Sequence, residues 1–305
     1  MFSILITTYN YDCSRFVRDL DVQCADFMAC TPGFDYEIIL GDDASTDETS
    51  KRANCEAVEQ LAHCRYVAAT ENSGLAAMRN RLAGEARFPY LLFFDSDAEV
   101  CTENFIATYW ANRDKADAVC GALRNPAGKA APGTELRWRY EHKAEKIRTV
   151  EYRMEHPYNF FTAFNLLISR DVFQRIRFDA RCSQYGYEDA LFGLELQRKG
   201  VSIVHIDNPL IHLGIDSNVS FLSKTETALR TLCALGSPMQ DFAGASRLQR
   251  KLQRAGLSRL LAAAFCTVRP LLRRHLLGRH PSLLVFNAYK LGYYCNLCRR
   301  RNEKG

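Results

Sequence analysis

The sequence predicts an α/β protein with a mostly parallel central sheet flanked by helices, followed by a basic helical C-terminal extension. Short apolar runs alternate with amphipathic stretches through the first half of the chain, the pattern of β-α-β units. The last quarter differs in charge and reads mainly as helix. With 305 residues, 47% hydrophobic and 25% charged, the chain is long enough to bury a large core.

Four apolar runs in the first half have the length of buried strands. They are residues 3–8, 36–40, 64–69 and 90–94. The stretches between them, residues 12–29, 46–62 and 75–86, have the spacing of apolar residues that is typical of helices. Asp47 or Ser45 is expected to cap the second helix, and the Gly74 turn to introduce the third.

The second half has weaker signals. "FNLLISRDVFQRI" predicts a strand and turn, "YEDALFGLELQRKG" a helix that ends at Gly200, and "VSIVHI" another strand. The segment 135–153 is rich in Arg, Lys, Tyr and Trp, and it is either part of a binding site or an amphipathic connecting helix. From about Phe221 onward helix dominates.

Acidic residues follow two of the predicted strands. In "YLLFFDSDAEV", Asp95 and Asp97 alternate by two and therefore point the same way from the carboxyl end of a buried strand. Ligands bind at that end in open α/β sheets, and two carboxylates repel unless a cation such as Mg²⁺ or Mn²⁺ shares them. A metal-diphosphate complex fits these residue types, although a polar loop after a strand explains D-x-D alone.

The second acidic pair, Asp42 and Asp43, follows the second strand in "IILGDDASTDET". If the strands are parallel, this pair lies at the same sheet edge as Asp95 and Asp97. A nucleoside could span the two pairs, with its base and ribose hydroxyls on the first pair and its diphosphate near the metal. An ordinary capped turn is the alternative.

The motifs "SILITTYN", "YEIILGDDASTDET", "ENSGLAAMRN", "LLFFDSDAEV" and "YGYEDALFGLEL", in this order, resemble the family 2 glycosyltransferases with a GT-A fold. The resemblance covers roughly residues 2–222. It implies a nucleotide-diphospho-sugar donor, a Mn²⁺ or Mg²⁺ cofactor and inversion at the anomeric carbon. It also implies a catalytic domain of residues 1–220, with a donor-binding half (1–120) and an acceptor-binding half (121–220), before the helical region 221–305.

The resemblance assigns roles to individual residues. Asp97 and Asp95 are expected to bind the metal, and His212 resembles a late histidine that serves some members as a third ligand. Glu188 and Asp189 match an acidic pair at a helix entrance, where Asp189 would act as the base that accepts the acceptor hydroxyl's proton. A plain helix N-cap is the alternative for that pair. The implied donor-binding residues are Thr8, Tyr9, Asp42, Asp43, Asn72, Gly74, Arg79, Asn80, Asp95 and Ser96.

The basic C-terminal region implies a different partner. Residues 242–305 carry 14 Lys and Arg against one acid, while the rest of the chain has a net charge of −8. Leucines among the arginines suggest amphipathic helices on an anionic membrane surface, and Pro270 and Pro281 are expected to divide them. Packing against the catalytic domain or a second subunit is the alternative, and no nucleic-acid recognition motif accompanies the charge.

The start of the chain has no pattern of a secretion signal, so the sequence predicts a cytoplasmic protein, held at the inner face of the cytoplasmic membrane if the basic region binds lipid. The twelve cysteines are then reduced, most of them as small core residues. The predicted activity is transfer from a UDP-sugar, the default donor, to a saccharide or lipid-linked saccharide in bacterial surface polysaccharide synthesis. The alternatives are a nucleotidyltransferase and a non-catalytic sugar-nucleotide-binding protein.

Overall fold

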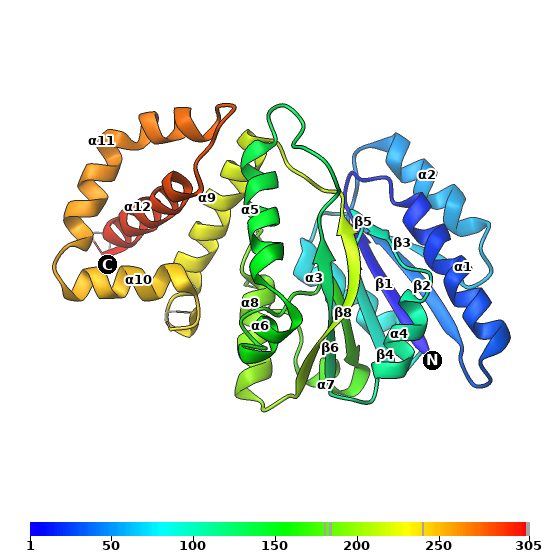
Figure 1. Cartoon of the computed structure of the whole chain (residues 1–305). Helices are drawn as coiled ribbons and strands as arrows, with labels where there is room; N and C mark the ends of the chain where they lie inside the picture. Colours follow the sequence, from blue (N-terminus) through cyan, green and yellow to red (C-terminus); the bar gives the residue numbers. More distant parts are fainter. Residues whose placement is uncertain (180, 183–184, 240, 303–305) are drawn as a thin grey trace. The chain divides into compact units, whose positions relative to one another are not determined.

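The structure, a computed structural model, describes residues 1–179, 181–182, 185–239 and 241–302 (Figure 1). It divides into two compact units. The first unit comprises Met1–Pro126, Arg148–Ser183 and Phe192–Gly214, and the second comprises Ala127–Ile147, Gln184–Leu191 and Ile215–Gly305.

The first unit is built around a mixed sheet. Its strands are β1 (Phe2–Thr8), β2 (Tyr36–Asp42), β3 (Cys64–Ala68), β4 (Tyr90–Asp95), β5 (Ala98–Val100), β6 (Ala118–Arg124), β7 (Asn165–Ser169) and β8 (Ile203–His212). Among the described residues the order is β3-β2-β1-β4-β7-β6-β8-β5. β1 pairs in parallel with β2 and β4, whereas β7 runs antiparallel to β4 and β6. The predicted α/β class with a largely parallel first half is confirmed.

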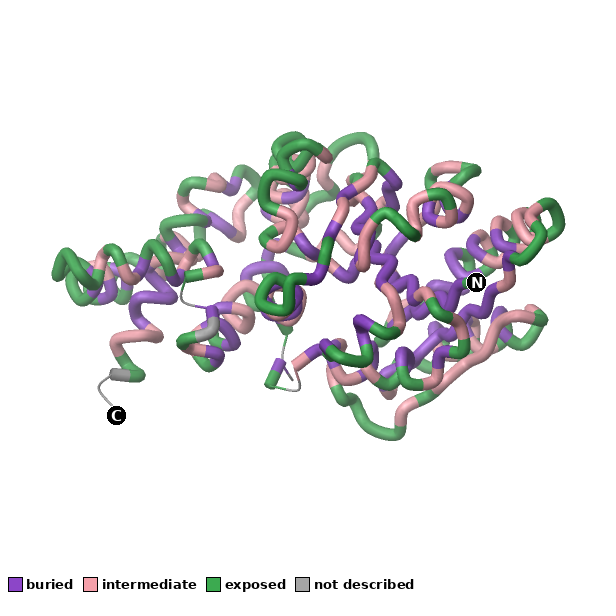
Figure 2. The backbone as a smooth tube through the Cα atoms, turned by 90° about the horizontal axis from the view of Figure 1, so that it is seen from below, coloured by how far each residue is buried: buried purple, intermediate pink, exposed green. Residues whose placement is uncertain are grey.

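Helices cover both faces of this sheet. They are α1 (Ser14–Cys30), α2 (Glu48–Glu59), α3 (Leu75–Glu85), α4 (Phe105–Asn112), α6 (Val150–Glu155), α7 (Arg170–Arg175) and most of α8 (Glu188–Arg198). Every residue of β1 and β2 is buried, which explains why these strands are predominantly apolar (Figure 2, the purple trace near the N-terminus). The predicted helices of the first half match α1, α2 and α3, and the Asp47 side chain caps α2 by accepting from the Thr49 amide at 3.1 Å.

Alternate residues of each strand meet different helices. Phe94 faces α1, where its ring centroid lies 6.0 Å from that of Phe16, and Phe93 faces α7, 5.0 Å from the ring of Phe173. A Cβ at Gly41 would lie 2.8 Å from the Leu82 side chain on α3, so glycine permits the close approach of that helix. The apolar run 90–94 therefore fills the core on both sides of the sheet.

His205, predicted to be structural, is buried in β8 and hydrogen-bonded at both ring nitrogens. Its Nδ1 lies 3.1 Å from the Arg153 guanidinium, a donor, so Nδ1 accepts and Nε2 donates to the Pro157 carbonyl at 2.9 Å. Burial, with the charge of Arg153 as a smaller cause, lowers the pKa of His205 to about 4. The neutral ring can accept from Arg153 at Nδ1 and donate to Pro157 at Nε2. The protonated ring would instead place a hydrogen on Nδ1 facing the Arg153 donor.

This arrangement predicts a loss of stability in acid. The pKa of His205 is lower in the folded chain than in the unfolded chain, so its contribution is complete above about pH 6.5 and declines as the pH falls toward 4. A difference of this size corresponds to about 3 kcal/mol. Urea unfolding at pH 7 and pH 4.5 measures it, and His205→Gln should flatten the dependence. If the free energy of unfolding of the His205→Gln protein fell equally steeply between pH 7 and pH 4.5, other groups would be responsible for the effect.

The second unit is helical and includes the segment 135–147, which forms α5 (Glu135–Ile147). Its other helices are α9 (Asn218–Leu235), η1 (Ser237–Met239), α10 (Gly244–Arg254), α11 (Ser258–Leu276) and α12 (Leu283–Asn302). The Tyr140 ring of α5 lies 5.5 Å from Phe221 of α9 and 5.7 Å from Phe286 of α12. Asn218 accepts from the Leu136 amide at 2.8 Å. These contacts support the connecting-helix interpretation of α5.

The predicted domain boundary near residue 220 stays a prediction; by compactness, α5 belongs with α9 and α12. Two expectations differ from the structure. Pro270 does not divide the basic region but lies inside α11, where it removes one backbone hydrogen bond, and α11 packs on α12 with the Phe265 ring 5.2 Å from that of Tyr289. The breaks lie at Gly256, where φ is +71°, between α10 and α11, and around Pro281, between α11 and α12, as predicted for that proline.

The second concerns the cysteines. All twelve are free thiols, but only five are buried. The others, Cys64 of β3 among them, lie at partly or fully exposed positions, so core packing does not account for most of them.

Candidate active site

The carboxyl ends of the central strands lie level with one another. Thr7 of β1 is in register with Asp95 of β4, and Thr8 with Asp42 of β2. The acidic residues after β2 and β4 therefore share one edge of the sheet, as the parallel arrangement predicted. That edge is where an α/β sheet places its ligands.

Asp97 and His212 meet at this edge although 115 residues separate them. β5 pairs antiparallel with the end of β8, which sets Ala98 opposite His212, and the Leu213 amide donates to the Asp97 carbonyl at 2.7 Å. The His212 Nε2 atom lies 3.1 Å from Asp97 Oδ2. His212 is buried, while the Asp97 side chain is 28% exposed. The two residues that the resemblance names as metal ligands thus lie side by side, and their role stays a prediction.

Asp97 and His212 suit a divalent ion held partly by a ligand. Carboxylate and imidazole are donors that Mn²⁺ accepts, and a metal bound to a diphosphate uses only one or two protein groups. No group of three or more His, Cys, Asp and Glu side chains in the part of the chain that the structure describes is placed to hold a metal alone. The pair would need oxygen atoms from a diphosphate and water to complete the coordination.

Gly214 makes room for Asp97. A Cβ built on Gly214 would lie 1.8 Å from Asp97 Oδ2 and 3.0 Å from His212 Nε2. We expect Gly214→Ala to displace the Asp97 carboxylate and to lower donor turnover at least about tenfold, while the free energy of unfolding changes little because the Asp97 carboxylate is not in the core. Steady-state kinetics and urea unfolding separate the two effects. Gly84→Ala, a glycine-to-alanine change inside α3 at a position with open space, is the control and should retain activity.

Asp95 is held by a buried arginine. The Arg79 side chain is only 2% exposed on α3, and its Nη2 atom donates to Asp95 Oδ1 at 2.6 Å. The Phe178 ring lies below the same guanidinium, 5.2 Å from its centre. Arg79 is therefore not a solvated helix residue. It fixes the orientation of Asp95 and brings a positive charge to the sheet edge.

Asp42 and Asp43 differ in their partners. Asp42 Oδ1 accepts from the Ser45 amide at 2.8 Å, and its other oxygen accepts from the Tyr66 hydroxyl. Burial and this bond to Asp42 raise the pKa of the Tyr66 hydroxyl. Both of its carboxylate oxygens are thus engaged within the protein, and Asp42 supports the turn after β2.

Asp43 organises the loop before α3. Its carboxylate accepts from the Ser73 amide, the Ser73 hydroxyl and the Gly74 amide, each at 2.8 Å. The Asn72 side chain donates to the Asp43 carbonyl at 3.0 Å. Gly74 has a φ of +86°, a conformation that favours glycine. The predicted donor residues of this segment are thus brought together, and Ser73 is an additional member that the sequence did not single out.

The loop after β1 lies on the other side of the candidate site. Thr8 is buried and donates to the Tyr11 carbonyl at 3.0 Å, whereas the Tyr9 side chain is exposed. Asn10, with a φ of +53°, accepts from the Thr46 amide at 2.7 Å. Asn10 was missed because one asparagine in a loop carries no distinctive pattern.

Two other predicted donor-binding residues, Ser96 and Asn80, have defined contacts. Ser96 is buried and lines a small hollow with Tyr11 and Glu99. Burial, and then the charge of Asp97, raise the pKa of Tyr11. Asn80 bonds to the backbone of Phe178 through both side-chain atoms, at 2.9 and 3.0 Å, so it orders that loop.

Glu188 and Asp189 lie in the first turn of α8, in the second unit. Tyr187, just before them, has a φ of +68°, and its carbonyl accepts from the Leu191 amide at 2.9 Å. A helix N-terminus stabilises the ionised form of a carboxylate. Gly186 packs against α9, where a Cβ would lie 2.4 Å from Ala228. The helix start is thus held rigidly within its own unit, and the role of the acidic pair stays a prediction.

The sequence matches the profile of glycosyl transferase family 2 over residues 3–177, more than half of the chain. The chain belongs to this family. The matched segment ends at residue 177, within the last part but one of the first unit, and it includes Asp43, Asp95 and Asp97. Family 2 membership and the arrangement of strands and helices together place the first unit in the GT-A fold.

Two curated proteins are similar in sequence. The poly(ribitol-phosphate) beta-glucosyltransferase of Bacillus spizizenii is 31% identical over 134 residues, 43% of this chain and 20% of that protein. The teichoic acid poly(glycerol phosphate) polymerase of Staphylococcus epidermidis is 30% identical over 101 residues, 33% of this chain and 13% of that protein. The chain therefore spans a fifth or less of the length of these relatives.

Solved structures share the fold. The structure of S. aureus TarS 1-349 with UDP-GlcNAc has a TM-score of 0.53 and 14% identity, covering 99% of this chain and 92% of that chain. The mannosyltransferase PcManGT of Pyrobaculum calidifontis, with GDP-Man and Mn²⁺, has a TM-score of 0.51 and 14% identity, covering 99% and 86%.

Proposed function

We propose that this chain transfers a sugar from a nucleotide-diphospho-sugar to a saccharide or lipid-linked saccharide hydroxyl, with inversion, in the synthesis of a bacterial surface polysaccharide. The observation that carries the proposal is the convergence of Asp43, Asp95, Asp97 and His212 at one sheet edge. Family membership supports the reaction class. The names of the two curated relatives support a surface polymer as the acceptor.

Donor binding would use both acidic positions. Asp43, anchored to Ser73 and Gly74, would accept a hydrogen bond from the base, with Thr8 and the exposed Tyr9 beside it. Asp95, oriented by Arg79, would meet the ribose or the metal. The neighbours hold UDP-GlcNAc and GDP-Man, so they do not select a base, and a UDP-sugar stays the default donor.

Asp97 and His212 would hold the divalent ion, Mn²⁺ or Mg²⁺, at their 3.1 Å approach. Such an ion, when bound, neutralises the charge that develops on the departing nucleoside diphosphate. Arg79 adds positive potential at the same edge. The hydrogen bond from the Leu213 amide to the Asp97 carbonyl fixes the backbone of Asp97, which keeps the Asp97 carboxylate close to His212.

Asp189 would take the proton in the transfer step. The acceptor oxygen forms a bond to the anomeric carbon while the bond from that carbon to the diphosphate oxygen breaks, and the hydroxyl proton passes to the Asp189 carboxylate. Attack on the face opposite the leaving group gives inversion. Glu188, the preceding residue, would orient the acceptor.

Incubation with a panel of nucleotide sugars tests the reaction class. We expect release of nucleoside diphosphate that requires Mn²⁺ or Mg²⁺ and is stimulated by a saccharide acceptor. Release of inorganic pyrophosphate from a nucleoside triphosphate and a sugar phosphate would identify a nucleotidyltransferase instead. Tight binding of a nucleotide sugar without turnover on any acceptor would identify a binding protein.

The C-terminal helices would also contact an anionic membrane. No single helix within the described residues passes as a membrane span by length and composition, and only α10 with α11, bent by 115°, passes as a pair. Leu260 and Leu271 of α11 are each 69% exposed among basic residues, and Leu284 of α12 is 81% exposed. Exposed leucines beside arginines are typical of helices that lie on lipid surfaces.

We expect the full chain to float with vesicles that contain phosphatidylglycerol. Replacing Leu260 and Leu271 with Gln should reduce the bound fraction several-fold, because each buried leucine contributes about 1.5 to 3 kcal/mol. Val22→Gln, an exposed apolar position on α1, is the matched control and should float normally. Undiminished flotation of the double variant would exclude these leucines from the contact.

A further inference from the structure

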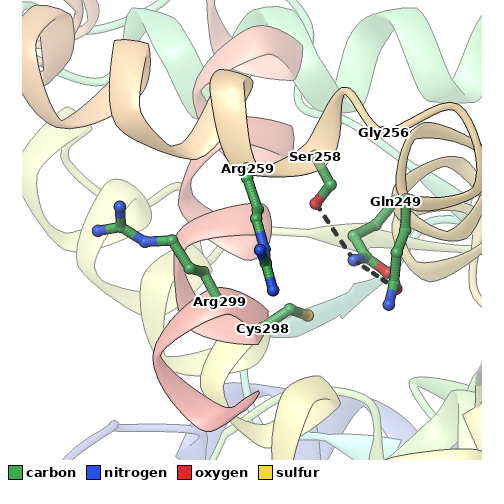
Figure 3. A pocket seen from close by; sticks show the side chains of 7 residues that line it. Gln249, Gly256, Ser258, Arg259, Cys298 and Arg299 are labelled. Atoms are coloured by element: carbon green, nitrogen blue, oxygen red, sulfur yellow. Dashed lines mark hydrogen bonds between the residues drawn. The ribbon is translucent and has the colours of Figure 1, made fainter. Parts of the chain in front are cut away.

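The three basic helices α10, α11 and α12 enclose a pocket of about 390 Å³ that the transfer reaction does not use (Figure 3). This volume is within the range of small-molecule sites. Each helix contributes to its wall. The lining residues are Gln249, Gln253, Gly256, Ser258, Arg259, Cys298 and Arg299.

The polar groups of the wall include hydrogen-bond donors and acceptors. The Gln249 amide nitrogen, on a residue only 6% exposed, donates to the Ser258 hydroxyl oxygen at 3.4 Å and to Gln253 Oε1 at 3.2 Å. Arg259 extends from α11 toward Cys298 on α12, on the side of the pocket opposite Gln249, whereas the guanidinium of Arg299 turns away from Gln249 (Figure 3). The pocket therefore combines a cation with an amide and a hydroxyl.

A helix N-terminus opens on the same space. α11 has 19 residues, begins at Ser258 and is preceded by Leu257, whose side chain has no atom that can cap the first-turn amides. The amide end of a helix carries partial positive charge and favours anions. At Gly256, φ is +71° and a Cβ would have nothing within 4 Å, so the backbone leaves the entrance open.

No carboxylate competes for these donors nearby in sequence. Residues 244–302, which contain all three helices, include no Asp or Glu. The nearest preceding acid, Asp241, pairs with Arg250. Such surroundings disfavour a metal ion and favour a ligand with concentrated negative charge and several acceptor oxygens.

We propose that this pocket binds a phosphate group, as a monoester or a diester. Arg259 supplies the charge, and the Ser258 hydroxyl, oriented by the Gln249 amide, and the first turn of α11 supply the directed hydrogen bonds. The volume leaves space for a small polar group esterified to the phosphate. The inference does not depend on the proposed glycosyl transfer, because the site lies wholly within the second unit and needs no donor or metal.

Isothermal titration calorimetry of the full chain with inorganic phosphate, at constant ionic strength and without nucleotide or metal, tests the site. We expect saturable binding that Arg259→Gln weakens at least about tenfold. Arg274→Gln removes the same charge from an exposed position of α11, 15 residues away, and should bind phosphate within about twofold of the unchanged protein. Equal losses in the two variants, or no saturable binding, would overturn the proposal.

Gln249→Met tests the buried amide separately from charge. It preserves approximate volume while removing the hydrogen bond that orients the Ser258 hydroxyl, so phosphate affinity should fall although Arg259 is present. Thermal unfolding of each variant reports whether the helices remain assembled. Normal phosphate affinity in a folded Gln249→Met protein would contradict the assignment of this pocket.

The source of the phosphate is distinguished by two further probes. Soluble glycerophosphoglycerol and vesicles of phosphatidylglycerol carry the same phosphodiester, one free and one as a lipid headgroup. Stronger binding to vesicles that depends on Arg259 supports the site and assigns it to lipid. Arg259-dependent binding of the soluble diester, with vesicle binding unaffected by the substitution, supports the site and assigns it to a soluble or polymeric phosphate.

Discussion

Asp97→Asn is expected to reduce metal-dependent turnover of the nucleotide sugar about a thousandfold. The amide keeps the size of the side chain but removes the charge that would hold the divalent ion with His212. A loss of several kcal/mol of stabilisation of the leaving diphosphate corresponds to a rate effect of this order. Initial rates of nucleoside diphosphate release, measured across a Mn²⁺ titration, give both the rate and the metal requirement.

Glu103→Gln is the charge-matched control for this experiment. Glu103 is exposed in the loop after β5 and has no part in the proposed site, so its variant should turn over like the unchanged protein. The free energy of unfolding of Asp97→Asn should stay within about 1 kcal/mol of that of the unchanged protein, since the side chain is partly exposed. Full turnover of Asp97→Asn at saturating Mn²⁺ would remove Asp97 from the metal site.

Asp189→Asn is expected to abolish transfer to the acceptor, with a fall of about 10² to 10⁴ in kcat, while donor affinity stays largely intact. An asparagine cannot accept the proton of the attacking hydroxyl. Donor affinity should persist because the proposed donor residues belong to the first unit, whereas Asp189 belongs to the second. Single-turnover transfer and equilibrium donor binding, measured on the same preparation, separate the two quantities.

Glu195→Gln provides the comparison on the same helix. Glu195 pairs with Arg198 at 2.8 Å near the end of α8, and its loss should leave transfer nearly unchanged. Transfer by Asp189→Asn at the rate of the unchanged protein would exclude Asp189 as the base. A parallel loss of donor affinity would indicate a positioning role instead.

Local patterns predicted the first half of the fold well. The runs 3–8 and 90–94 became β1 and β4 because they are buried from both faces, and a continuous apolar run is the expression of that environment. The capping signal at Asp47 was equally local. β5 escaped prediction because three residues carry no readable periodicity, and its pairing partner, β8, lies more than 100 residues later in the chain.

The site was predicted as residue types but not as contacts. His212 was a candidate ligand on resemblance, and the pairing of β5 with β8 supplies the geometry. The ion pair of Arg79 with Asp95 was not foreseen, because a helix surface residue and a buried one have the same sequence signature at a single position. Ser73 and Asn10 were missed for the same reason.

The sequence by itself determined the family, the order of the first strands and helices, and the charge contrast between the catalytic part and the C-terminal helices. These properties reside in composition and short-range periodicity, which burial and helix geometry impose on each segment separately. Only the tertiary structure decided that Asp97 lies next to His212, that Asp42 accepts a hydrogen bond from the Tyr66 hydroxyl, and that α10, α11 and α12 line a pocket with no carboxylate among its lining residues. Those outcomes depend on which segments pair across long sequence separations, and pairing is settled by the packing of the whole unit rather than by any segment alone.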